Sequence, residues 1–160
     1  MASNRHLGRI VALQTLYEID FLFEVSQEVV DTEAILKRNV DRYKEVVEDK
    51  EFITSLVEGV LKLNKQLDAL IQPIAPDWPL DQIARIDRTI LRMGVYELHH
   101  NSLVPSKVVI NEAVELAKSF GADNSSKFVN GVLGTAYKHI EKERDPEVKP
   151  KSKKAKISKK

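Results

Sequence analysis

Residues 72–98 read QPIAPDWPLDQIARIDRTILRMGVYEL, a proline-rich corner followed by a strongly periodic apolar segment. Three prolines fall within the seven residues from Pro73 to Pro79. They exclude a long helix there, because proline lacks the N–H donor and restricts the residue before it. Beyond the corner, apolar residues recur at helical spacing over a wide arc: Ile83, Ile86, Ile90, Leu91, Met93, Gly94 and Leu98. Such an arc predicts a buried helix at the centre of the fold.

The chain on the N-terminal side of this corner has the same helical period. Apolar residues alternate at intervals of four and three, and polar residues that suit a helix N-cap precede two of the periodic segments. The pattern predicts three helices. The first covers about residues 4–24 with Ser3 or Asn4 as its cap, the second has Asp31 or Thr32 as its cap and apolar positions from Leu36 to Val47, and the third has apolar positions from Phe52 to Leu70.

Two further helices are predicted on the C-terminal side of the central one. Pro105 suits the first turn of the earlier helix, and Gly121 is expected to end it in a left-handed conformation. Asp123 or Asn124 is expected to cap the last helix, which runs to about Ile140.

Two residues, Gly131 and Trp78, are not explained by the local helical pattern and point to contacts with other parts of the fold. Gly131 lies inside the last predicted helix, where glycine costs about 1 kcal/mol relative to alanine. We therefore expect another helix to pack closely against it. Trp78 lies between two prolines at the corner, and we expect it to be a structural anchor.

These elements predict an all-α fold, because no segment with the period of a strand and no fixed repeat stands out. About three helices lie on each side of the corner. The N-terminal half covers about residues 4–72 and the C-terminal half about residues 78–143, in one helical domain of residues 1–143. The remaining residues, 144–160, form a lysine-rich tail that we expect to be disordered.

Composition places the chain among globular proteins of a reducing compartment. Apolar residues make up 42% and charged residues 31%, and cysteine is absent. No apolar run approaches the roughly 20 residues of a membrane span, and the N-terminus lacks a secretion signal, so we expect a cytoplasmic protein. The net charge of +1 hides an asymmetry, since the last fifteen residues carry seven lysines and one glutamate. The rest of the chain is acidic, which disfavours general binding to nucleic acid.

No catalytic constellation is present in the sequence. The four histidines are not at metal-ligand spacing, and the glycine-rich loops that hold phosphates are absent. We therefore expect no enzyme activity, no metal and no cofactor.

The start of the first helix carries a small basic cluster, made by Arg5, His6 and Arg9. Residues three and four apart project from one face of a helix. Cations at a helix N-terminus oppose its dipole, so folding alone does not favour them there. Arginine suits phosphate binding and stacking on bases, although ordinary surface arginines are an equal interpretation.

A second candidate lies in SFGADNSSKFVNGVL, residues 119–133, where the helical pattern breaks and restarts. A helix N-terminus offers free N–H groups to a phosphate. Asn124 and Ser125 are hydrogen-bond donors, Lys127 adds charge, and Phe128 offers a ring for base stacking. Taken alone, the stretch fits a capped helix corner better than an RNA site.

The chain resembles the NusB family of transcription antitermination factors in three segments: DWPLDQIARIDRTILRMGVYEL, VPSKVVINEAVELAKSFGADNSSKFVNGVL and ALQTLYE. The resemblance runs from about Arg5 to Tyr137. It implies two packed three-helix bundles, about seven helices in all, with a short extra helix near the tryptophan-proline turn. It also implies a non-enzymatic function: binding of a short single-stranded RNA element, boxA, together with the ribosomal protein NusE, within RNA polymerase complexes that transcribe ribosomal RNA.

The resemblance also assigns residues. The RNA-binding surface of the family matches Arg5, His6 and Arg9 at the start of the first helix, with Leu7 and Gly8 where other members carry more arginines. Its second part matches the corner: Lys118, Asn124, Ser125, Lys127 and Phe128. The NusE-binding surface matches Tyr17 and Asp87. Glu97 matches a motif as well, and a structural role, such as a bond to backbone or to an arginine like Arg92, is an equal interpretation.

Two alternatives accompany this hypothesis. The same helical surface could serve as a protein–protein scaffold or in a homodimer, with only incidental RNA binding. The fold also resembles the N-terminal module of certain ribosomal RNA cytosine methyltransferases, but a chain of 160 residues is expected to carry no catalytic domain. A single RNA surface requires that the two basic patches lie on the same side of the molecule.

Overall fold

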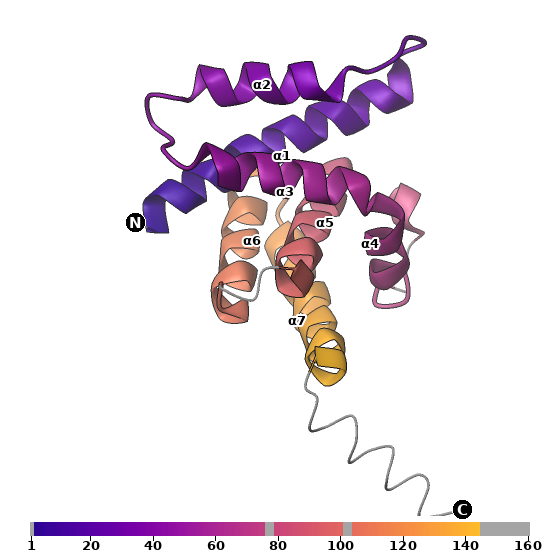
Figure 1. The fold of residues 1–160 in the computed structure, drawn as a ribbon. Helices are drawn as coiled ribbons and strands as arrows, with labels where there is room; N and C mark the ends of the chain where they lie inside the picture. The colour runs from indigo at the N-terminus through magenta and orange to yellow at the C-terminus, as the bar shows by residue number, and fades with distance from the viewer. Residues whose placement is uncertain (1, 76–78, 101–103, 145–160) are drawn as a thin grey trace, which may run out of the picture.

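Seven α-helices and one 3-10 helix make up the part of the chain that the computed structural model describes, residues 2–75, 79–100 and 104–144 (Figure 1). The helices are α1 (Ala2–Val25), α2 (Thr32–Arg42), α3 (Lys50–Lys62), α4 (Asn64–Ile71), η1 (Leu80–Gln82), α5 (Arg85–His100), α6 (Ser106–Phe120) and α7 (Ser125–Arg144). The predicted all-α fold is confirmed. Trp78 and residues 145–160 lie outside the described residues, so the anchor and the tail stay predictions.

The N-terminal bundle consists of α1, α2 and α3, which lie together at the top of Figure 1. Asp31 caps α2, as predicted, by accepting a hydrogen bond from the N–H of Ala34 at 3.0 Å, and Asp49 caps α3 in the same way. Helix α1 begins at Ala2, so the expected caps, Ser3 and Asn4, are wrong and lie inside its first turn.

The third predicted helix is in fact two helices, α3 and α4. The chain changes direction at Leu63, whose ψ of 16° leaves the helical range. The apolar period continues across this break because Leu67 and Ile71 of α4 enter the same core. Periodicity therefore could not reveal the corner. In Figure 1, α4 descends from the end of α3, and it packs beside α5.

Helix α5 is the central helix, as its apolar arc predicted. It packs against α1, α3, α4, α6 and α7, and eight of its residues are buried. Gly94 allows a close approach, since a Cβ atom there would lie 2.7 Å from a methyl group of Leu133 in α7. The C-terminal bundle of α5, α6 and α7 lies below α1 and α3 in Figure 1. The two packed three-helix bundles are thereby confirmed.

Ion pairs join the two bundles along the α1–α5 contact. Asp20 of α1 lies 3.1 Å from Arg85 and 3.2 Å from Arg88. Near the other end of α5, Arg9 pairs with Glu97. Early residues of α1 therefore face late residues of α5, and the helices run antiparallel. Arg92 pairs with Asp68 of α4 at 2.7 Å instead, so the arginine expected for Glu97 is corrected from Arg92 to Arg9.

Three expectations about glycine and proline are wrong. Gly121 has φ −94° and ψ −173°, so it is extended rather than left-handed. Glycine suits the position because a Cβ atom there would lie 2.5 Å from the Ser125 side chain. A Cβ atom on Gly131 would meet no described atom of another helix within 4 Å, so no helix packs closely against it there. Pro105 is the N-cap residue of α6 and not part of its first turn.

A helix that crosses a membrane needs about 20 predominantly apolar residues. Within residues 2–75, 79–100 and 104–144, no helix is long and apolar enough to cross a membrane.

Candidate nucleic-acid interface

Arg5 is the exposed arginine of the first α1 turns. Its side chain is 42% exposed and lies 3.6 Å from Asp49. Its guanidinium carbon is 4.4 Å from the centroid of the Phe52 ring in α3, within the range of a cation–π contact. The ring therefore holds a guanidinium in place at the surface, where phosphate or a base can reach it.

Arg9 lies one turn further along α1 but is only 2% exposed. Its Nε and Nη2 atoms each donate to Glu97 at 2.8 Å, which makes a bidentate pair between α1 and α5. A buried guanidinium with this partner does not reach an RNA strand. We therefore correct the predicted direct RNA contact of Arg9 to a structural one.

His6 is half-buried and joins α1 to α6. Its Nδ1 lies 2.6 Å from the Glu112 carboxylate, which accepts the hydrogen bond. Glu112 also lies 3.8 Å from Arg9. This contact fixes the orientation of the imidazole ring because it engages Nδ1. The other ring nitrogen, Nε2, can then bind a ligand.

The corner between α6 and α7 separates the predicted residues into two groups. Ser125 is buried, and its hydroxyl oxygen accepts a hydrogen bond from the N–H of Ala122 at 2.9 Å, so its predicted RNA contact is corrected to a structural bond that shapes the loop. Asn124 and Lys127 are exposed, and Phe128 is half-buried against the core. Asn124 directly precedes α7, and its carbonyl accepts from the N–H of Phe128, as expected for a cap residue.

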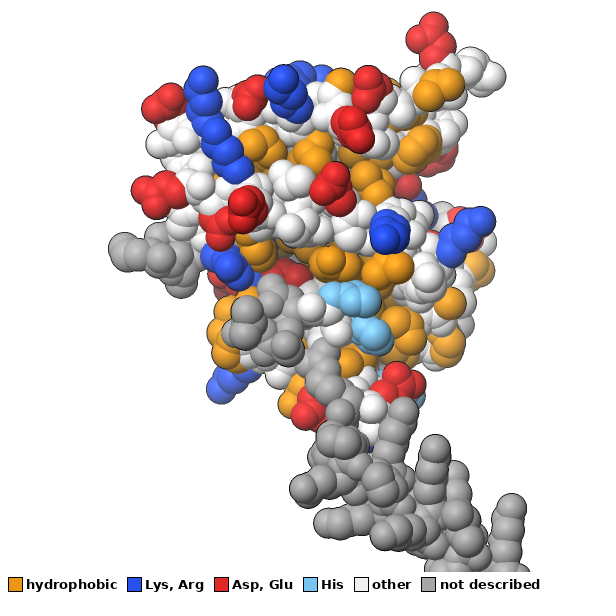
Figure 2. Space-filling view, viewed as in Figure 1, with side chains coloured by type: hydrophobic (Ala, Val, Ile, Leu, Met, Phe, Trp, Pro, Cys, Tyr) orange, Lys and Arg blue, Asp and Glu red, His pale blue; other side chains and the backbone are white. Residues whose placement is uncertain are grey.

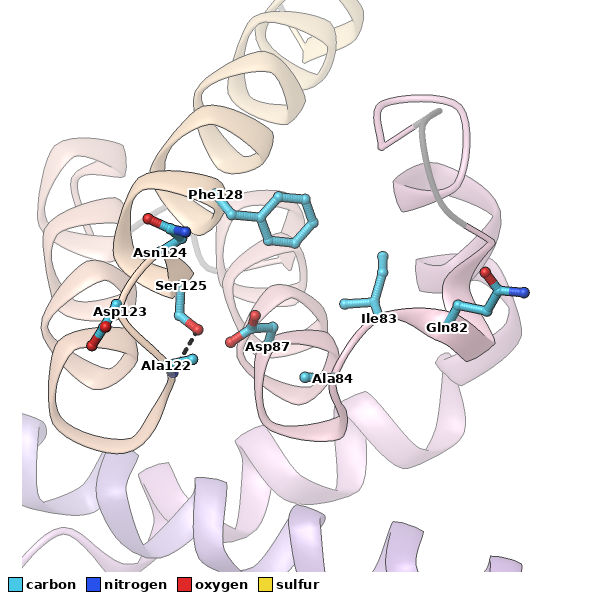
Figure 3. Close-up of a pocket in the computed structure, with 9 residues that line it drawn as sticks. All are labelled: Gln82, Ile83, Ala84, Asp87, Ala122, Asp123, Asn124, Ser125 and Phe128. Atoms are coloured by element: carbon cyan, nitrogen blue, oxygen red, sulfur yellow. Dashed lines mark hydrogen bonds between the residues drawn. The ribbon is translucent and has the colours of Figure 1, made fainter.

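A pocket of about 510 Å³ lies between this corner and the start of α5 (Figure 3). Asp87 and Ser125 point toward each other in it, and the Phe128 ring lies above them. One carboxylate oxygen of Asp87 is buried and has no hydrogen-bond partner among the described residues. The residues that line the pocket include Asp87 and Asp123 but no lysine or arginine from the described part of the chain. Asp87 and Asp123 are therefore the charged side chains among its described lining residues.

Helix α6 connects the two predicted parts of the RNA surface. Glu112, which holds His6, lies eight residues before Phe120 at the end of α6. A rise of 1.5 Å per residue places them about 12 Å apart along the helix. Lys118 is exposed between them and lies 3.5 Å from Glu115. About two turns of α6 therefore lie between Glu112 and the corner.

Tyr17 belongs to an exposed aromatic pair on α1. Its side chain and that of Phe21, one turn later, are both exposed. The Arg85 guanidinium lies 5.8 Å from the Tyr17 ring centroid and 5.4 Å from that of Phe21. Phe21 was not among the predicted residues, although its spacing of four from Tyr17 is a visible signal.

Comparison with known protein families decides the affiliation of the chain. The model of the NusB family matches residues 6–138. This chain belongs to the NusB family. The matched span contains every predicted site residue except Arg5, which directly precedes it.

Relatives and solved structures of the family agree with this affiliation. The chain is 42% identical over 147 residues to transcription antitermination protein NusB of Chloroflexus aggregans, with 91% of this chain and 94% of the relative covered. It is 41% identical to the NusB protein of Dehalococcoides mccartyi, with 88% and 94% covered. NusB of T. maritima has the same fold, with a TM-score of 0.75 and 31% identity over 84% of this chain and 90% of that structure. A structure of antitermination factors NusB and NusE in complex with dsRNA gives a TM-score of 0.74 and 26% identity, with 87% and 99% covered.

Proposed function

We propose that this NusB-family chain is a transcription antitermination factor that binds boxA-type single-stranded RNA together with NusE. In this proposal it joins RNA polymerase complexes during ribosomal RNA transcription, in the cytoplasm, and acts by binding rather than by catalysis. Two observations outside the chain support it: its relatives are named for antitermination, and one similar structure holds NusB and NusE in complex with dsRNA, which supports RNA as a class of ligand. The observation that carries the proposal is that six of the eight predicted RNA residues are partly or fully exposed: Arg5, His6, Lys118, Asn124, Lys127 and Phe128.

The proposed RNA surface consists of Arg5, His6, Lys118, Asn124, Lys127 and Phe128. Arg9 and Ser125 support it from below, by fixing α1 against α5 and by shaping the corner loop. The cations supply the affinity for phosphate. Phe128 supplies a face for a base, and the amide of Asn124 can reach a base edge or a ribose.

The proposed NusE surface consists of Tyr17, Phe21 and Asp87. The unpartnered oxygen of Asp87 needs a donor, and the carboxylates of Asp87 and Asp123 are the charged groups among the described residues that line the pocket. A cationic or N–H-bearing side chain of a protein partner fits these requirements better than RNA does. Because Phe128 of the RNA surface lines the same pocket, the two surfaces adjoin, and one bound partner can favour the other.

Fluorescence anisotropy tests this proposal. The labelled ligands are a boxA-like RNA and a scrambled RNA of equal length, each at two salt concentrations, with and without NusE. The proteins are the full chain and a version that ends at Arg144. We expect preference for the boxA-like RNA, tighter binding with NusE, and little change when the lysine tail is removed. Equal binding of both RNAs that disappears with the tail would instead support the scaffold or homodimer alternative, and light scattering would then identify a dimer.

A further inference from the structure

Arg85, the first residue of α5, lies against one side of α1. That side carries two aromatic and two acidic residues at positions i, i+3, i+4 and i+7 of the helix: Tyr17, Asp20, Phe21 and Glu24. Residues at this spacing project in the same direction. The guanidinium of Arg85 interacts with all four of them. We call these five residues the Arg85 cluster.

Carboxylates fix the guanidinium of Arg85. Its Nε donates to Oδ2 of Asp20 at 3.1 Å, and its Nη2 pairs with Glu24. Asp20 is fixed in turn, because Oδ2 also lies 3.2 Å from Arg88 and Oδ1 lies 3.7 Å from Arg92. The Arg85 side chain is only 18% exposed. An arginine with two carboxylate partners and little exposure is held in one position at this surface.

Two exposed rings lie against this guanidinium. The rings of Tyr17 and Phe21 are both within the range of a cation–π contact with Arg85. Exposed side chains otherwise change rotamer within picoseconds to nanoseconds. A planar guanidinium favours stacking on an aromatic face, so a fixed guanidinium restricts each ring to fewer orientations.

Charge alone does not distinguish the Arg85 cluster. On the face that Figure 2 presents, acidic and basic side chains are interspersed over the N-terminal bundle, and exposed pairs of such charges contribute little. The Arg85 cluster differs because its arginine is largely buried and contacts two rings of the proposed NusE surface. Rings that are ordered before a partner binds reduce the conformational entropy that binding costs.

We propose that Arg85 is a positioning residue of the proposed NusE surface and acts through the rings of Tyr17 and Phe21. Asp20 and Glu24 fix its guanidinium, and the guanidinium orders the two rings in the free chain. The rings then contact the protein partner. The identity of that partner rests on the proposed function, whereas the ordering of the rings is a property of this chain alone.

The first measurement concerns the free chain and follows the NMR signals of the Tyr17 and Phe21 rings. The variant is Arg85→Ala. The matched control is Arg88→Ala, which also removes an ion pair with Asp20 but leaves the guanidinium that lies against the two rings. We expect Arg85→Ala to shift both ring signals, and Arg88→Ala to leave them close to those of the wild type.

The second measurement is the affinity for NusE. We expect Arg85→Ala to weaken it about fivefold, because the partner must then order the rings itself, and Arg88→Ala to leave it unchanged. Arg85→Lys keeps the charge but lacks the planar group, so it should unfold near the wild-type midpoint and still weaken binding. It also replaces Arg85→Ala in both measurements if that variant does not fold. In a Tyr17→Leu/Phe21→Leu background, loss of Arg85 should have little further effect.

Three results would overturn the inference. One is that a folded Arg85 variant has the ring signals of the wild type, or that Arg88→Ala shifts them equally. Another is that the Arg85 variants bind NusE like the wild type. The third is an undiminished effect of Arg85→Ala in the Tyr17→Leu/Phe21→Leu background, because Arg85 would then act without the rings. A wild-type chain that does not bind NusE, with ring signals that still depend on Arg85, would refute the proposed function instead.

Discussion

Arg5 and Arg9 lie one helical turn apart on the same face of α1, yet the structure gives them opposite roles. Arg5 is at the surface on the Phe52 ring, whereas Arg9 is buried against Glu97. The sequence could predict that both project from one face. It could not predict the depth of each, because the partner of Arg9 is 88 residues away on α5.

Substitution of the two arginines by alanine should separate stability from binding. Arg9→Ala leaves Glu97 buried and unpaired, so we expect it to lower the free energy of unfolding by about 3–5 kcal/mol. Arg5→Ala should leave stability almost unchanged but weaken RNA binding and reduce the salt slope by about 0.7. Urea unfolding and anisotropy over a salt series measure these effects. A stable Arg9→Ala variant, or an Arg5→Ala variant with wild-type salt dependence, would contradict these assignments.

Glu112 is expected to act as a positioning residue through His6. Glu112→Ala removes the acceptor that orients the imidazole ring, so we expect weaker RNA binding, whereas Glu112→Gln keeps an acceptor and should retain part of the affinity. The affinity of His6→Ala serves as the reference. If Glu112→Ala weakens RNA binding in a background that already carries His6→Ala, Glu112 does not act through this ring.

Phe128 is expected both to pack against the core and to stack on a base, and a substitution by alanine would remove both contacts at once. Its ring packs partly against the core and also lines the pocket at the corner. Phe128→Ala should therefore cost stability as well as about 1–3 kcal/mol of RNA binding, if a base stacks on the ring. Phe128→Leu keeps most of the packing and removes the aromatic face. It should unfold near the wild-type midpoint and still lose RNA affinity in the anisotropy measurement; unchanged affinity would show that no base stacks there.

At the scale of elements, helices α5 and α7 differ in the space around a glycine, Gly94 in α5 and Gly131 in α7. No described atom of another helix lies within 4 Å of a Cβ atom placed on Gly131, whereas one on Gly94 would collide with Leu133. Gly131→Ala should therefore raise the free energy of unfolding by about 0.8–1.0 kcal/mol, the propensity difference between the two residues. Gly94→Ala should lower it. Urea unfolding of both variants gives the signs, and a destabilised Gly131→Ala would mean that the exposed face of α7 is constrained.

The helices themselves were largely predictable, because period and capping residues locate most of their boundaries. Two boundaries are exceptions. Helix α2 ends at Arg42, although the apolar pattern predicted for it continues to Val47, and α3 ends and α4 begins at Leu63 with no proline or glycine to mark the change. The conformation of Gly121 was mispredicted for a related reason. Its requirement is space for Ser125 rather than a positive φ, and that requirement exists only after α6 and α7 have packed.

The candidate site was predictable only in its residue types. Sequence pattern singles out the corner of residues 119–133, but it does not distinguish exposed Asn124 from buried Ser125. It also assigns Asp87 and Phe128 to different partners without showing that both line one pocket. The apolar period includes Phe52 but does not reveal that its ring holds Arg5. Such contacts between distant segments are set by packing, which periodicity does not encode.

At the scale of the whole molecule, one hydrophobic core and the ion pairs between α1 and α5 join the two bundles. The proposed RNA surface and the proposed NusE surface each include residues of these two helices or of elements packed against them. Binding of either partner to bundles joined in this way costs little rearrangement for the other. Since the surfaces adjoin at the pocket that contains Asp87, we expect the partners to reinforce each other.

The most direct test of this central claim is a closed binding cycle. It measures the dissociation constant of a boxA-like RNA with and without saturating NusE, and that of NusE with and without saturating RNA, for the wild type and for Asp87→Asn. We predict that each partner tightens the other by the same factor, about 5–150-fold, and that Asp87→Asn reduces this factor. Dissociation constants that are independent of the second partner would contradict the account.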